Sequence, residues 1–307
     1  MNSAWHWVSI GTADLEAALA FWVGKLGFEE IGVAEGDDPG LRAHWRLPDQ
    51  KVVRQAMIRA PRAAFGAIHL VEWGGTTESV RAAAAVFDLC PKNLDIYVDD
   101  LPRRMAELAE QGVAFRNKQY SEAVSPDGVH FREIHLAGHD DINLVLLQIL
   151  GSETPVPATG FYGVGPLVCI VRDPASEKRF CQQVLGLALS HDNILAGPEI
   201  EQMIGLPQGC ALEVSIWAEP GQPLGEVELV TYQGTEGADR YPRARPGSRG
   251  VTHLDGWVED IEALSSHLSS HGVTYRSSQF EGCLIQTHTT LAFRSPAGLR
   301  IEAHTAI

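Results

Sequence analysis

A short series of signals occurs four times along the chain and constrains the fold more than any other feature. Each copy has an apolar run, an aspartate, an amphipathic stretch and then a glycine. Aspartate is a preferred N-cap and glycine a preferred C-cap, so each copy predicts a short strand followed by a helix. The aspartates are Asp14, Asp100, Asp173 and Asp260, and the glycines follow 13, 12, 13 and 12 residues later at Gly27, Gly112, Gly186 and Gly272.

The alternation of the two spacings indicates a repeat of higher order. The first and third aspartates are 159 residues apart and the second and fourth are 160 apart, so a pair of modules is duplicated. We therefore predict an N-terminal domain in residues 1–150 and a C-terminal domain in residues 161–307, each built from two modules. Residues 151–160 are rich in Gly, Pro, Ser and Thr and lack periodicity, which is typical of a linker.

Runs of β-branched and aromatic residues, separated by turn signals, follow each helix. There are three such runs per module, so each module is predicted as βαβββ and the chain as an α+β protein. Examples are residues 67–73, 212–217, 226–232 and 299–304.

Charge and cysteine content limit the function classes. The chain has 24 basic and 39 acidic residues, a net charge of −15, which disfavours nucleic acid or an anionic membrane as its main partner. Its five cysteines form no CxxC pair, and no apolar stretch approaches the ~20 residues of a membrane span. We expect a cytoplasmic protein that acts on a small molecule, and we leave open whether it forms a homo-oligomer.

Four βαβββ modules in tandem resemble the vicinal oxygen chelate superfamily, which includes glyoxalase I, methylmalonyl-CoA epimerase, bleomycin resistance proteins and extradiol dioxygenases. The helix exits at residues 25–28 and 184–187 and the segment 294–302 carry the resemblance, which covers nearly the whole chain. It implies a glyoxalase/dioxygenase-like fold, in which the modules pair into two half-barrel domains. It also implies that the first and last strands of the modules hold a divalent metal ion around a cavity.

The resemblance places the metal ligands seven residues before each helix-starting aspartate and within each last strand. In the N-terminal half these positions hold one imidazole, two amides and an indole, so we expect that half to be metal-free. They are Trp7, His69, Asn93 and Asn143.

In the C-terminal half the corresponding positions are Pro166, Glu228, His253 and Glu302. One imidazole and two carboxylates with an open corner suit one divalent ion, Fe, Mn, Zn or Mg. The alternative is that the two glutamates are ordinary strand carboxylates and His253 is a core residue.

The resemblance implies a glyoxalase- or epimerase-type lyase or isomerase, in which the metal polarises a substrate carbonyl and Glu228 acts as base. His288 is a candidate proton shuttle. A ring-cleaving dioxygenase is the first alternative, although Pro166 replaces a histidine ligand and Ala292 a tyrosine of that group. A binding protein without turnover, of the resistance type, is the second.

A pocket for an aromatic or carbonyl-containing substrate is also expected near the predicted metal. Large apolar side chains would form its walls, and an arginine would hold an anionic group. The candidates are Trp217, Tyr232, Trp257, Phe293 and Arg294.

Overall fold

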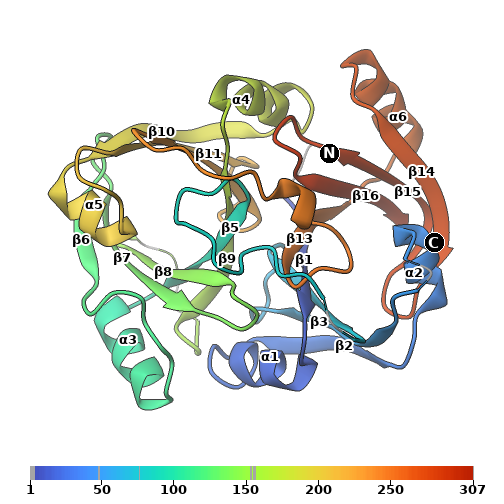
Figure 1. The fold of residues 1–307 in the computed structure, drawn as a ribbon, viewed down its shortest axis with the longest axis horizontal. Coiled ribbons are helices and arrows are strands. Elements are labelled where there is room, and N and C mark those ends of the chain that lie inside the picture. Colours follow the sequence, from blue (N-terminus) through green and yellow to red (C-terminus); the bar gives the residue numbers. More distant parts are fainter. Residues whose placement is uncertain (1–3, 48, 76, 153, 155–156, 307) are drawn as a thin grey trace.

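Two eight-stranded sheets lie side by side and each curls into a half-barrel (Figure 1). The computed structural model describes residues 4–47, 49–75, 77–152, 154 and 157–306. Sheet I has the strand order β14 (Tyr275–Glu281), β15 (Gln286–Arg294), β16 (Arg300–Ala306), β13 (Gly250–Trp257), β1 (Trp7–Thr12), β4 (Ala67–Trp73), β3 (Val52–Arg59) and β2 (Glu29–Glu35). Sheet II has the order β10 (Ala188–Ala196), β11 (Ala211–Ala218), β12 (Glu226–Gln233), β9 (Phe161–Ile170), β5 (Pro91–Val98), β8 (Asn143–Ile149), β7 (His130–Ala137) and β6 (Ser121–Val124).

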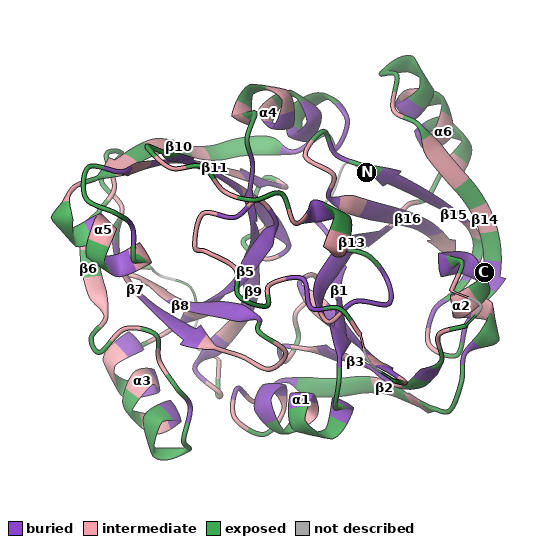
Figure 2. Ribbon diagram, viewed as in Figure 1, coloured by how far each residue is buried: buried purple, intermediate pink, exposed green. Residues whose placement is uncertain are grey.

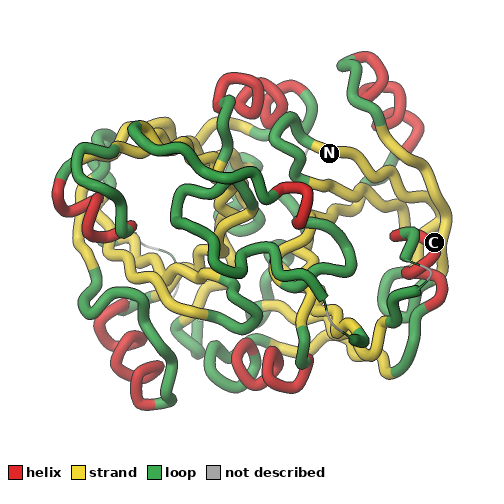
Figure 3. Tube along the Cα trace, viewed as in Figure 1, coloured by secondary structure: helices red, strands yellow, loops and turns green. Residues whose placement is uncertain are grey.

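The helices of the described residues are α1 (Leu15–Trp22), α2 (Pro39–Trp45), α3 (Leu101–Glu110), α4 (Pro174–Gln183), α5 (Pro198–Ile204) and α6 (Ile261–Ser270), with a short 3-10 helix at Tyr241–Arg243. Helices α1, α3, α4 and α6 lie around the outside of the two sheets, whereas the short 3-10 helix lies between them (Figure 3). None of these helices is long and apolar enough to cross a membrane.

The repeat predicted from the sequence is confirmed in four helices, α1, α3, α4 and α6. Each begins after one of the four aspartates, whose carboxylate accepts a hydrogen bond from a backbone N–H in the first turn. Each glycine stop has a positive φ, between 68° and 76°, which a residue without a side chain adopts at little cost. The α+β fold of four βαβββ modules paired into two half-barrels is thereby confirmed.

The pairing of the modules differs from the predicted one. Sheet I combines the first and fourth modules, because β1 runs antiparallel to β13, and sheet II combines the second and third, because β5 runs antiparallel to β9. Each sheet therefore takes one module from each half of the chain. The sequence offsets identify which modules are copies of each other, but pairing depends on which strand edges meet in space. Of the predicted linker, residues 153 and 155–156 lie outside the described residues.

Buried side chains concentrate on the central strands β1, β5, β9 and β13, whereas the helices expose their outer faces (Figure 2). One hydrophobic cluster contains residues from all four of these strands, so the two sheets share a core. Its members include Ile10, Ile96, Leu167 and Leu254.

Candidate functional site

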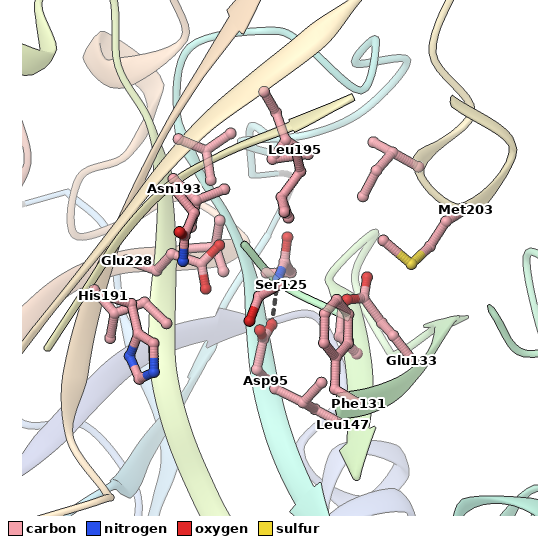
Figure 4. A pocket seen from close by; sticks show the side chains of 18 of the residues that line it. Asp95, Ser125, Phe131, Glu133, Leu147, His191, Asn193, Leu195, Met203 and Glu228 are labelled. Carbon is pink, nitrogen blue, oxygen red and sulfur yellow. Dashed lines mark hydrogen bonds between the residues drawn. The ribbon is translucent and has the colours of Figure 1, made fainter. Parts of the chain in front are cut away.

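Sheet II encloses a cavity of about 300 Å³. Apolar side chains from strands and from α5 form most of its wall, among them Phe131, Leu147, Leu195 and Met203 (Figure 4). A concave site of this size, mostly apolar with a few polar groups, is typical of small-molecule binding.

Four carboxyl groups line this cavity: Asp95 on β5, Glu133 on β7, and Glu226 and Glu228 on β12. Figure 4 labels Asp95, Glu133 and Glu228. Burial, with Glu133 nearby, raises the pKa of Glu228 from 4.5 to about 8. Burial and the charge of Glu228 raise the pKa of Asp95 well above its ordinary value, although Asn93 donates a hydrogen bond to it. Like charges in a poorly solvated space do not all ionise, so part of this cluster stays protonated at neutral pH.

Two further polar contacts lie in the same wall. The hydroxyl of Tyr97 donates to Glu226 at 2.9 Å, and Nζ of Lys92 donates to the hydroxyl of Tyr232 at 2.6 Å. Burial raises the pKa of Glu226 to about 7. Several perturbed pKa values gathered in one cavity mark a candidate functional site.

Four of the implied metal-ligand positions come together in sheet II, as Asn93, Asn143, Pro166 and Glu228. Two amides, a proline and one carboxylate are a poor donor set for a divalent ion. The cavity of sheet II is therefore suited to an organic ligand rather than to a metal.

A different donor set is found inside sheet I. His253 and Asp255 on β13 and Glu302 on β16 each offer a ligand atom, and these atoms lie within 4.8 Å of one another. All three side chains are at most 1% exposed. We call them the metal-competent cluster, and in the described part of the chain no other such group of His, Cys, Asp and Glu occurs.

The imidazole of His253 gives the clearest sign that this cluster suits a metal ion. Its Nδ1 contacts Thr252 Oγ1 at 2.8 Å, but its Nε2 is buried without a hydrogen-bond partner. Burial lowers the pKa of His253, so the ring is neutral and Nε2 offers a lone pair once Nδ1 carries the proton. One neutral imidazole and two carboxylates fit a divalent ion.

Both carboxylates of the cluster are also hydrogen-bonded to the protein. Asp255 accepts from Ser9 at 2.8 Å and contacts His304 Nε2 at 3.0 Å. Glu302 accepts from Arg300 at 2.6 Å. Burial alone would raise the pKa of Glu302, but Arg300 and nearby imidazoles outweigh it and hold the pKa well below its ordinary value.

Helix α2 closes this half-barrel over the cluster. His44 Nε2 contacts Glu302 at 2.7 Å, and its ring stacks on Phe280 of β14 with 4.3 Å between centroids. The indole of Trp45 meets His253 edge-on at 5.4 Å. The side chains of His44 and Trp45 therefore cover the cluster.

The structure separates the three predicted metal ligands. His253 and Glu302 come together, but Glu228 lies in sheet II, because the fourth module pairs with the first and not with the third. His288 is exposed at an irregularity of β15, four residues along that strand from Ala292, which pairs with Glu302.

The predicted pocket residues are also dispersed. Tyr232 lines the cavity of sheet II, whereas Trp217 and Phe293 belong to the hydrophobic core. Trp257 packs against Trp7, and Arg294 is exposed and donates to the carbonyl of Gly298.

Sequence reasoning missed two acidic residues that now define the sites, Asp95 and Asp255. Each lies two residues after a first-strand ligand position, Asn93 or His253, and therefore on the same face of its strand. That spacing was a usable signal. The sequence offered no comparable signal for Glu133 or His44. Glu133 reaches its site from a neighbouring strand, and His44 reaches its site from a helix between two strands.

Comparison with solved structures supports the fold. The chain superposes on glyoxalase I from Zea mays with a TM-score of 0.65 at 12% identity, over 98% of this chain and 92% of that chain. A point variant of the same maize enzyme gives a TM-score of 0.67 at 12% identity over 99% and 94%. A proposed dioxygenase from Bacillus subtilis strain 168 gives 0.61 at 14% identity over 99% and 86%. No family model matches the sequence, and no curated protein matches it.

These similarities define the structural class. Over essentially its whole length the chain shares the four-module, two-half-barrel fold of these solved structures. Sequence identities of 12–14% carry the fold and leave the activity to be argued from the site.

Proposed function

We propose that the protein binds a small organic molecule in the cavity of sheet II. The observation that carries this proposal is an apolar cavity of about 300 Å³ with carboxyl groups of raised pKa in its wall and a poor metal-donor set. Glu228 keeps the role of candidate acid or base, since a group whose pKa is about 8 exchanges a proton readily near neutral pH.

A neutral two-ring probe, 2-naphthylacetamide, tests the cavity without involving ligand charge. Isothermal titration calorimetry should give saturable binding to the wild-type protein. Leu195→Trp should abolish it, because the side chain of Leu195 faces the cavity and an indole would fill that space.

Ile194→Trp is the matched control. Ile194 precedes Leu195 on β10, points to the opposite face of the strand and is 57% exposed. This variant should bind the probe as the wild type does. Equal affinities of wild type and Leu195→Trp, or no binding at all, would contradict the proposal.

The metal-competent cluster favours a second function, a metal-dependent lyase or isomerase of the glyoxalase or epimerase type. A divalent ion at His253, Asp255 and Glu302 would supply a Lewis acid that polarises a substrate carbonyl. His44 and Trp45 would have to withdraw before a substrate entered. The ring-cleaving alternative gains less support, because Ala292 pairs with Glu302 on the neighbouring strand and offers no hydroxyl.

Metal binding is measured by equilibrium dialysis against Zn²⁺ or Mn²⁺ followed by elemental analysis. We expect one ion per chain, and loss of that ion in His253→Ala. His191→Ala, which removes an imidazole from sheet II, should leave the stoichiometry unchanged. A wild-type protein without bound ion, or a His253→Ala variant that retains it, would remove this second candidate.

A further inference from the structure

A second hollow, of about 410 Å³, adjoins the cavity of sheet II. The two spaces share Lys92, His135 and Ile204 in their walls. Arg81 and Arg116 line the second hollow as well, so three cationic side chains border one space. A molecule in the cavity can therefore extend one end toward these cations.

None of the three cations forms an ion pair with any residue that the structure describes. Each donates a hydrogen bond to an uncharged group, while the charge of Lys92 partly offsets the raised pKa of Asp95 and of Glu228 in the adjoining cavity. Arg81 donates to the thiol of Cys90, Arg116 to the side-chain oxygen of Asn143, and Lys92 to the hydroxyl of Tyr232.

Asp141 is the one carboxylate among the residues that line this hollow, and its Oδ2 accepts a hydrogen bond from Ser79 at 3.0 Å. Lys92 also interacts with carboxyl groups of the cavity, but the two guanidinium groups of Arg81 and Arg116 still exceed this one carboxylate. Burial and repulsion between the two guanidinium groups lower the pKa of Arg116, and the charge of Asp141 partly opposes this shift. The whole chain has a net charge of −15, so a local excess of positive charge in this hollow contrasts with the rest of the molecule.

A chain of hydrogen bonds joins the hollow to the carboxyl groups of the cavity. Arg116 Nε donates to Asn143 Oδ1 at 2.5 Å, and Asn143 Nδ2 contacts His135 Nδ1 at 3.1 Å. His135 Nε2 in turn contacts Glu133 Oε1 at 2.8 Å. The cationic and acidic groups thus form one connected wall.

We propose that the second hollow binds the anionic group, a carboxylate or a phosphate, of the same molecule whose apolar body occupies the cavity. The guanidinium groups of Arg81 and Arg116 present donors suited to an oxyanion, and Lys92 lies where the two spaces meet. This inference rests on the proposed function and adds the class of the ligand, an amphipathic organic anion.

The test compares probes that share one apolar body. Titration calorimetry with 2-naphthylacetate and 2-naphthylacetamide separates the anionic group from the rings, and naphthyl phosphate distinguishes phosphate from carboxylate. The wild type should bind an anionic probe about tenfold or more tightly than the amide, as charge-assisted hydrogen bonds predict. In Arg116→Gln, and more fully in the double variant with Arg81→Gln, this preference should vanish while the amide affinity stays within about twofold.

Lys118→Gln removes an exposed positive charge two residues from Arg116 and outside the hollow. It should keep the preference for the anion. Three results would overturn the inference while leaving the cavity proposal intact. They are equal binding of the amide and the anions by the wild type, tighter binding of naphthylethylamine than of the anions, and a loss of anion preference in Lys118→Gln equal to that in Arg116→Gln. Failure of the amide to bind the wild type would instead contradict the proposed function.

Discussion

Glu228→Gln removes an ionisable group from the cavity of sheet II while nearly preserving its size. In the folded protein the pKa of Glu228 is about 8, against 4.5 for an unperturbed glutamate. Between these two pH values the folded protein retains a proton that the unfolded chain has released. Raising the pH through this window therefore destabilises the wild type, and above pH 8 the whole loss in free energy of unfolding is present.

The size of this effect follows from the two pKa values. The rise from 4.5 to about 8 corresponds to at most about 5 kcal/mol, at about 1.4 kcal/mol per pH unit. Glu228 is partly exposed to the cavity, and water there lowers the cost, so we expect about 1–3 kcal/mol. Glu228 also contributes to the raised pKa of Asp95, so the substitution relieves that carboxyl as well.

Urea unfolding followed by tryptophan fluorescence measures the difference in stability between pH 6 and pH 9. The free energy of unfolding of the variant should increase relative to that of the wild type as the pH rises. Glu110→Gln, at the exposed end of α3, is the control and should show no such trend. A difference between Glu228→Gln and wild type that stays constant over this range would refute the reasoning, because Glu228 would then ionise with an ordinary pKa.

Three glycine-to-alanine substitutions should destabilise the protein in a fixed order, measured by urea unfolding. Gly11→Ala should cost most, on the order of 3 kcal/mol or more, because its Cβ would lie 1.9 Å from the backbone oxygen of Ser248, which joins the first module to the fourth. Gly165→Ala should cost about 1–3 kcal/mol, because its Cβ would lie 2.3 Å from the ring of Tyr97, which can shift. Gly74→Ala makes ordinary contacts and should change stability by less than about 1 kcal/mol. An equal cost at all three positions would contradict the close approach at Gly11.

The features that the sequence predicted well are local ones. Each helix begins where an aspartate can cap it and ends where a glycine can take a positive φ, and both signals lie within one module. The fold class follows from repeating such a module four times. These predictions needed no knowledge of which residues meet in space.

The composition of the sites could not be predicted in this way. A single change in module pairing moves Glu228 away from His253 and places Ser9 opposite His253 instead, with His69 on the following strand, β4. In both sheets the first strand of one module runs antiparallel to the first strand of another module. Every module has such a first strand, so local sequence patterns do not show which two modules pair. The distinction depends on contacts such as the approach of Gly11 to Ser248, which lie 237 residues apart in the sequence.

The first and third modules carry a short helix between their second and third strands, α2 in sheet I and α5 in sheet II. Helix α2 inserts His44 and Trp45 over the metal-competent cluster, whereas α5 contributes Met203 to the wall of the cavity in sheet II. The same inserted element therefore closes one half-barrel and shapes the other. The metal donors therefore lie beneath α2, whereas no residue of α2 lines the ligand cavity of sheet II. This difference is the physical reason for placing ligand binding in sheet II ahead of metal-dependent catalysis in sheet I.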